Sequence, residues 1–202
     1  EALDYRHSKE EAMESGAYFK RDLGMENMLR VINREMPIHV HVHRSDDICT
    51  AIRIAKEYDL DMVLVHCTDG IAIADYLAEN PYPVIVGPGM TPRSKQETWN
   101  KTYATAGVLS KAGLKVCLTA DHDVTPLYFL TVYAGLAVRY GMDELEALKA
   151  ITLNPAQVMG IDGRKGQLKE GLDADIVLWN KHPFAHDVAV ERVLLNGAWV
   201  EN

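Results

Sequence analysis

Four short apolar segments, separated by stretches of helical periodicity, most constrain how this chain of 202 residues can fold. The apolar segments are residues 38–43, 62–65, 84–86 and 114–119. Helices are predicted at residues 46–58, 97–111 and 126–140, and again after residue 143. Short strands separated by helices pair in parallel, because each strand–helix–strand unit closes through a right-handed crossover. The pattern predicts an α/β fold, either a barrel or a doubly wound sheet.

The two ends of the chain differ from this pattern. Ser8 and Glu11 have capping-box spacing, and apolar side chains recur at helical intervals from Met25 to Met36, so a helix is predicted before the first strand. Beyond Gly166, residues 176–179, 188–195 and 198–200 are predicted strands, with a hairpin turn at residues 196–197. The change from α/β to β character falls near residues 160–172.

Composition excludes several classes of protein. The formal charge of -8 comes from scattered acidic residues, whereas nucleic-acid and anionic-membrane surfaces need clustered Lys and Arg. No run approaches the roughly 20 apolar residues that span a bilayer. Three cysteines without CxxC spacing suggest neither a disulfide framework nor a cysteine-rich zinc site. We therefore expect a cytoplasmic protein that binds neither nucleic acid nor membrane.

Alternating histidines mark the first strand. His39, His41 and His43 share one face, because side chains along a strand have a period of two, and the apolar residues between them face the other way. Imidazoles directed inward and apolar residues directed outward are expected where a barrel interior opens into a metal site. The alternative is a polar layer whose hydrogen bonds are satisfied inside the barrel.

Two further polar residues follow strand ends. His66 ends the second apolar segment and Asp121 follows the fourth. In parallel α/β folds, chemistry is built at the carboxyl ends of strands and in the loops after them. The alternatives are a capping hydrogen bond for His66 and a helix cap before Pro126 for Asp121. His122 is a candidate substrate contact or a donor to neighbouring carboxylates.

Together these residues predict a metal site. Histidine nitrogens and a carboxylate around an open position suit Zn²⁺ or a similar divalent metal, which lowers the pKa of bound water to about 7. Asp121 is the candidate catalytic residue, because a carboxylate can ligate metal, accept the proton of water and pass it to a leaving amine. In the loop of residues 87–95, Arg93 and Lys95 are candidates for binding a substrate carboxylate, with a solvated rigid turn as the alternative.

The order of these strand ends, followed by a specific tail, resembles the amidohydrolase superfamily. The most specific segments are residues 151–156, Gly160, residues 166–171 and residues 174–177. The chain is most similar to the imidazolonepropionase-like and Xaa-Pro dipeptidase-like branch. The similarity extends from about Leu23 to the end.

This resemblance implies the carboxyl-terminal half of a (β/α)8 barrel. Strands 5–8 would lie in a partial barrel domain of residues 1–165, and residues 166–202 would form part of a small β-sandwich. His41 would be the metal ligand of strand 5, His66 that of strand 6, and Asp121 the aspartate of strand 8. His43 would be a neighbour or a substrate contact, which adds it to the candidate substrate contacts His122 and Arg93 given above.

The resemblance also implies an activity, the hydrolysis of a C–N amide bond in a small molecule, cyclic amide or dipeptide. Deamination is the second enzymatic alternative, and a non-catalytic half-barrel is the third. Because the chain begins with Glu1 and no strand precedes residue 38, its start looks like an interior point. Four strands cannot close an eight-stranded barrel, so we expect a second copy of the chain or an amino-terminal half to complete it.

Overall fold

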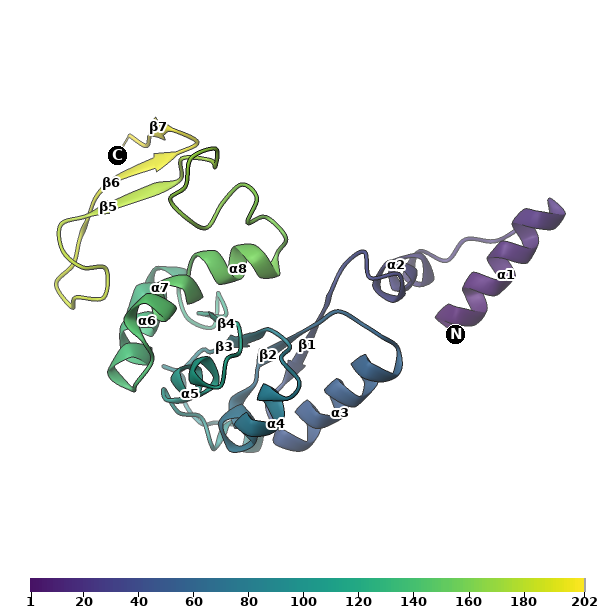
Figure 1. The fold of residues 1–202 in the computed structure, drawn as a ribbon, viewed down its shortest axis with the longest axis horizontal. Coiled ribbons are helices and arrows are strands. Elements are labelled where there is room, and N and C mark those ends of the chain that lie inside the picture. The colour runs from purple at the N-terminus through teal and green to yellow at the C-terminus, as the bar shows by residue number, and fades with distance from the viewer. Residues whose placement is uncertain (202) are drawn as a thin grey trace.

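A parallel sheet forms the centre of the computed structural model, which describes residues 1–201. Its four strands lie in the order β1-β2-β3-β4. They are β1 (Ile38–Val42), β2 (Met62–His66), β3 (Val84–Val86) and β4 (Val116–Leu118). All three pairings are parallel, and the register places Val42 opposite His66 and His66 opposite Val86. The predicted α/β class and the predicted strands are confirmed, and the strand ends meet at one edge of the sheet (Figure 1).

Helices connect the strands and follow the last one. After β1 comes α3 (Ser45–Glu57), and after β2 come the 3₁₀ helix η1 (Thr68–Ile73) and α4 (Ala74–Ala78). After β3 come η2 (Gln96–Thr98) and α5 (Thr105–Lys111). After β4 come η3 (Leu127–Phe129), α6 (Leu130–Arg139), α7 (Glu144–Ala150) and α8 (Leu153–Val158). The periodicity did not predict η1, α4 and α8, which are five or six residues long.

The helix predicted over residues 97–111 is much shorter in the structure. Only η2 and α5 are helical, and the segment between them is a loop. The Lys101 carbonyl accepts a hydrogen bond from Arg93 Nη2 at 2.7 Å, and the Lys101 ammonium donates to Thr91. These contacts with the preceding loop hold the segment in a non-helical conformation.

The core lies where these helices pack on the sheet. Ile48 and Ile52 of α3 are fully buried, as are Leu64 of β2 and Leu109 of α5. The helical spacing that predicted α3 therefore also predicted its buried face. Burial of such apolar side chains is the main stabilising contribution to a fold of this kind.

The amino-terminal helices α1 (Ala2–Ser15) and α2 (Leu23–Ile32) stand away from the sheet (Figure 1). Glu26 of α2 accepts hydrogen bonds from Lys9 Nζ at 2.7 and 2.8 Å and from Tyr5 Oη at 2.9 Å. The capping role predicted for Ser8 is wrong, because α1 begins at Ala2 and Ser8 lies in its middle.

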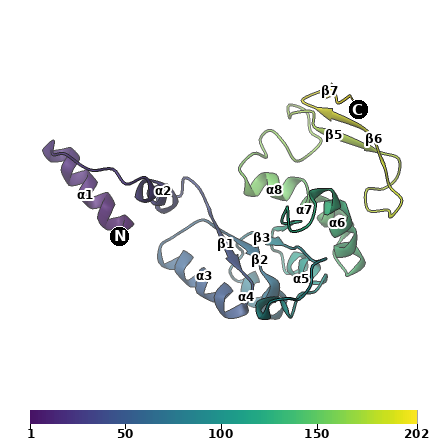
Figure 2. The same cartoon turned by 180° about the vertical axis from the view of Figure 1, so that it is seen from behind.

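A second sheet follows α8. It is antiparallel in the order β5-β6-β7, with β5 (Ile176–Trp179), β6 (Val190–Leu195) and β7 (Ala198–Trp199). Asn196 and Gly197 have φ values of 50° and 78°, which the predicted hairpin turn requires. Figure 2 shows this sheet apart from the parallel sheet, with α6–α8 between them. The division at residues 165 and 166 stays a prediction, and residue 202 lies outside the described residues.

None of the helices within residues 1–201 combines the length and the apolar character that crossing a membrane requires.

Candidate metal centre

Three histidines converge at the carboxyl edge of the parallel sheet. His41 lies on β1, His43 directly follows β1, and His66 ends β2. Each offers one ring nitrogen, and these nitrogens all lie within 4.8 Å of one another. The Nε2 atoms of His41 and His43 are 3.0 Å apart. Two nitrogens bound tetrahedrally at about 2.0–2.1 Å would lie roughly 3.3 Å apart, so this donor set fits a metal such as Zn²⁺.

Hydrogen bonding fixes which nitrogen of His66 faces the site. Its Nδ1 lies 2.6 Å from the carbonyl oxygen of Gly87, and a carbonyl can only accept, so Nδ1 carries the proton. The Nε2 lone pair is then available as a ligand, the arrangement common among metal-binding histidines. Gly87 has a φ of 131°, and a Cβ there would overlap the Thr119 carbonyl oxygen, so the position requires glycine.

A hydrogen bond with Thr68 orients the imidazole of His43. Its Nδ1 lies 2.7 Å from Oγ1 of Thr68, the first residue of η1. Burial, followed by repulsion from His66, lowers the pKa of His43 to about 4. Burial, followed by repulsion from His66, also lowers the pKa of His41. At neutral pH both rings are therefore neutral, which is the form that binds a metal.

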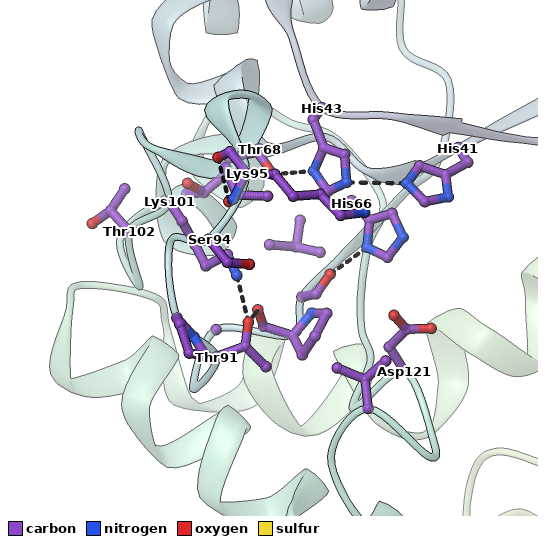
Figure 3. A pocket seen from close by; sticks show the side chains of 18 residues that line it. His41, His43, His66, Thr68, Thr91, Ser94, Lys95, Lys101, Thr102 and Asp121 are labelled. Atoms are coloured by element: carbon purple, nitrogen blue, oxygen red, sulfur yellow. Dashed lines mark hydrogen bonds between the residues drawn. The ribbon is translucent and has the colours of Figure 1, made fainter.

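Asp121 lines the same cavity from the loop after β4. The cavity has a volume of about 390 Å³, within the range of small-molecule sites. Figure 3 shows the Asp121 carboxylate directed toward the histidines. Its backbone N–H donates to Thr119 Oγ1 at 2.9 Å, which fixes the turn that carries it.

The backbone is strained at two of the predicted site residues. His66 and Asp121 have φ values of 71° and 51°, and Cys67 beside His66 has 47°. Residues other than glycine rarely adopt positive φ, because the Cβ approaches the carbonyl oxygen. Such strain persists only where the surrounding structure enforces it, and it is concentrated at functional sites.

Of the remaining predicted residues, only some line the cavity. Lys95 lines the cavity, whereas Arg93 and His122 are not among its lining residues within the described part of the chain. Arg93 donates to the Lys101 carbonyl. His39 lies at the opposite end of β1, in a separate depression.

Thr68 and Lys101 also line the cavity, although neither was among the predicted site residues. Thr68 follows a strand end by two positions and could have been found by that placement. Lys101 gave no signal, because it lies in a segment predicted to be helical.

Nearly the whole chain, including the tail segments, matches a known protein family. A model of the amidohydrolase family matches residues 22–200. This chain belongs to the amidohydrolase family. The resemblance predicted from the sequence is confirmed, and the family is one of hydrolytic enzymes.

Solved and curated relatives extend beyond this chain. An amidohydrolase structure from Thermotoga maritima superposes with a TM-score of 0.94 at 42% identity, covering 99% of this chain and 52% of that one. Imidazolonepropionase of Thermoplasma volcanium is 33% identical over 111 residues, which are 50% of this chain and 27% of that protein. A zinc-bound adenosine deaminase from Xanthomonas campestris has a TM-score of 0.62 at 20% identity, over 86% of this chain and 47% of that one, and shows the shared fold alone. The chain therefore spans about half the length of these solved relatives, and less of the curated one.

Proposed function

We propose that this chain supplies part of the active site of a metal-dependent hydrolase that cleaves a C–N amide bond in a small molecule, cyclic amide or dipeptide-like substrate. The main support for this proposal is a cluster of three imidazole nitrogens that lie within 4.8 Å of one another, in a cavity that the Asp121 carboxylate also lines. His41, His66 and Asp121 would hold a divalent metal, with Zn²⁺ as the first choice for this donor set. When bound, the metal would supply an activated water nucleophile.

The residues around the cavity have separate roles in this proposal. Gly87 and Thr68 orient His66 and His43, respectively, through the hydrogen bonds at their Nδ1 atoms. An oxygen of the Asp121 carboxylate would accept the proton of the attacking water and deliver it to the leaving nitrogen, as a general base and then a general acid. His43 would bind metal or contact substrate, and its place in the nitrogen cluster favours the metal.

We also propose that β1–β4 correspond to strands 5–8 of a (β/α)8 barrel and that residues 166–202 form part of a β-sandwich. The support is the match of nearly the whole chain to about half of the Thermotoga maritima amidohydrolase. The strands that complete the barrel would come from an amino-terminal half or from a second copy of the chain. The small-molecule substrate and the cytoplasmic location stay predictions.

Metal analysis of purified protein tests the site. Zinc content, measured by inductively coupled plasma mass spectrometry, should fall in His41→Ala and in His66→Ala. His39→Ala is the matched control, since His39 lies on the same strand and face but outside the cavity. Unchanged zinc in both test variants would remove the proposed site. His43→Ala separates the two roles of His43, because only a ligand should lower the zinc content.

Deamination is the second candidate function, and a fold shared with an adenosine deaminase supports it. The two reactions differ in their products, because a deaminase releases ammonia from an amidine-like carbon whereas an amidase releases an amine and a carboxylate. Profiling N-substituted amides and aminopurines with the zinc-loaded protein, with ammonia measured enzymatically, separates them, because hydrolysis of an N-substituted amide releases no ammonia.

A further inference from the structure

A buried tyrosine hydroxyl joins two loops of the candidate metal centre. Tyr133 of α6 is only 5% exposed. Its Oη lies 3.0 Å from Thr125 Oγ1, after β4, and accepts a hydrogen bond at 3.3 Å from the backbone N–H of Met90, after β3. Thr125 Oγ1 in turn lies 2.5 Å from the Ala120 carbonyl oxygen. These contacts connect the loop after β3, helix α6 and the turn that carries Asp121.

The direction of each hydrogen bond follows from the available donors. A carbonyl can only accept, so Thr125 donates its single hydroxyl proton to Ala120. Thr125 Oγ1 must then accept from the Tyr133 hydroxyl, whose oxygen accepts from Met90. The hydrogen bonds thus run in one direction, from the Met90 N–H through both hydroxyls to the Ala120 carbonyl. Removing the Tyr133 hydroxyl would break two of these three hydrogen bonds.

The last of these hydrogen bonds holds the backbone beside Asp121. The Ala120 carbonyl belongs to the peptide group that precedes Asp121, and it also accepts from the Thr125 N–H at 3.3 Å. The N–H of the same peptide group donates to Thr119 Oγ1 at 2.9 Å. The peptide group is therefore held on both sides, next to a residue whose φ of 51° is unfavourable. Strain of this kind persists only where the surrounding structure enforces it.

The first of these hydrogen bonds lies in the loop that orients His66. The Gly87 carbonyl, 2.6 Å from His66 Nδ1, belongs to the same loop as the backbone N–H that donates to Tyr133. A Cβ added at Gly89 of this loop would lie 3.6 Å from Cε1 of the Tyr133 ring. Tyr133 thus contacts the loop that orients one candidate ligand and is linked to the turn that carries another.

We propose that Tyr133 is a positioning residue, whose hydroxyl holds the Asp121 carboxylate in place beside the histidine cluster by joining the two loops. Tyr133 is not among the lining residues of the cavity in the described part of the chain, so it acts through other residues. The proposal rests on the proposed function in one respect, the role of Asp121 as a metal ligand. The order of the turn that carries Asp121 can also be measured without metal.

Zinc affinity measures the effect on Asp121. The dissociation constant, determined by competition with a chromophoric chelator, should rise about 10-fold in Tyr133→Phe, because groups that orient a metal ligand contribute roughly 10- to 100-fold to metal affinity. Thr125→Val removes the next hydroxyl and should have a similar effect, whereas Thr125→Ser keeps it and should bind zinc like the wild type. Tyr140→Phe is the matched control, since Tyr140 directly follows α6 and is 48% exposed.

A double-mutant cycle separates positioning from a general loss of stability. In the Asp121→Ala background, Tyr133→Phe should change the zinc dissociation constant by less than about 2-fold, because the carboxylate that Tyr133 positions is gone. Where Asp121→Ala weakens zinc binding, two results would overturn the proposal. One is an unchanged constant in Tyr133→Phe, and the other is an equal effect of Tyr133→Phe in both backgrounds.

Amide hydrogen exchange, followed by NMR, examines the same link without metal. The Val124 N–H donates to the Asp121 carbonyl at 2.7 Å and closes the turn. In Tyr133→Phe, exchange of the Asp121 and Val124 amides should become roughly 2- to 10-fold faster, the effect of one lost hydrogen bond. The Ile52 amide of α3 is the internal control and should keep its rate. Unchanged exchange in the turn, or an equal rise at Ile52, would refute the role of Tyr133.

The two measurements keep the two hypotheses apart. If Asp121→Ala binds zinc like the wild type, Asp121 is no ligand, and the metal site of the proposed function is refuted. The exchange rates of the Asp121 and Val124 amides then decide alone whether Tyr133 orders this turn.

Discussion

A buried hydrogen bond of Asn154, in the tail segment of residues 151–156, gives a quantitative prediction about stability. Asn154, only 8% exposed, donates from Nδ2 to the Val116 carbonyl of β4 at 2.7 Å. Replacing Asn154 by Ala removes a hydrogen bond worth about 0.5–1.5 kcal/mol and leaves a buried carbonyl unsatisfied, a penalty of about 1–3 kcal/mol. We expect a net loss of about 2 kcal/mol in the free energy of unfolding, equivalent to a fall in Tm of roughly 4–8 °C.

Urea unfolding followed by circular dichroism measures this loss. Asn100→Ala is the matched control, since the Asn100 amide also donates one hydrogen bond, to Asp69 Oδ1 at 3.0 Å, but on the exposed surface. That variant should lose less than about 0.5 kcal/mol. Asn154→Asp should be more destabilising than Asn154→Ala, because it places an acceptor against the Val116 carbonyl. Equal losses in Asn154→Ala and Asn100→Ala would refute the reasoning.

Two further substitutions and one chemical modification test the packing. Gly107→Ala should destabilise the protein by about 1–3 kcal/mol in thermal unfolding despite the higher helix propensity of Ala, because the new Cβ would lie 2.7 Å from the backbone N of Met142. Gly163→Ala, whose Cβ would meet nothing within 4 Å, is the control and should be nearly neutral. Burial raises the pKa of the Cys117 thiol to about 12, so iodoacetamide at pH 8 should alkylate Cys49 far faster than Cys117. Comparable labelling of both cysteines, read by peptide mass spectrometry, would contradict the buried position of Cys117.

The roles of Gly87 and Thr68 at the site depend on tertiary contacts that the sequence did not reveal. Gly87 reads as part of a Gly-Pro-Gly turn, and only the structure shows that its carbonyl orients His66 and that Thr119 leaves no room for a side chain. The same holds for Thr68 and His43, which are 25 residues apart in sequence. A hydrogen bond between distant segments has no local signature.

The sequence by itself determined the α/β class, the four parallel strands and the family, because periods of 2 and 3.6 and the strand-end order are local properties of the chain. It also placed His41, His66 and Asp121 at strand ends. Only the tertiary structure decided that His43 joins His41 and His66 in one nitrogen cluster, and that Lys101 rather than Arg93 faces the cavity. Both outcomes depend on how separate loops pack against each other, and that packing is set by contacts between residues far apart in the chain.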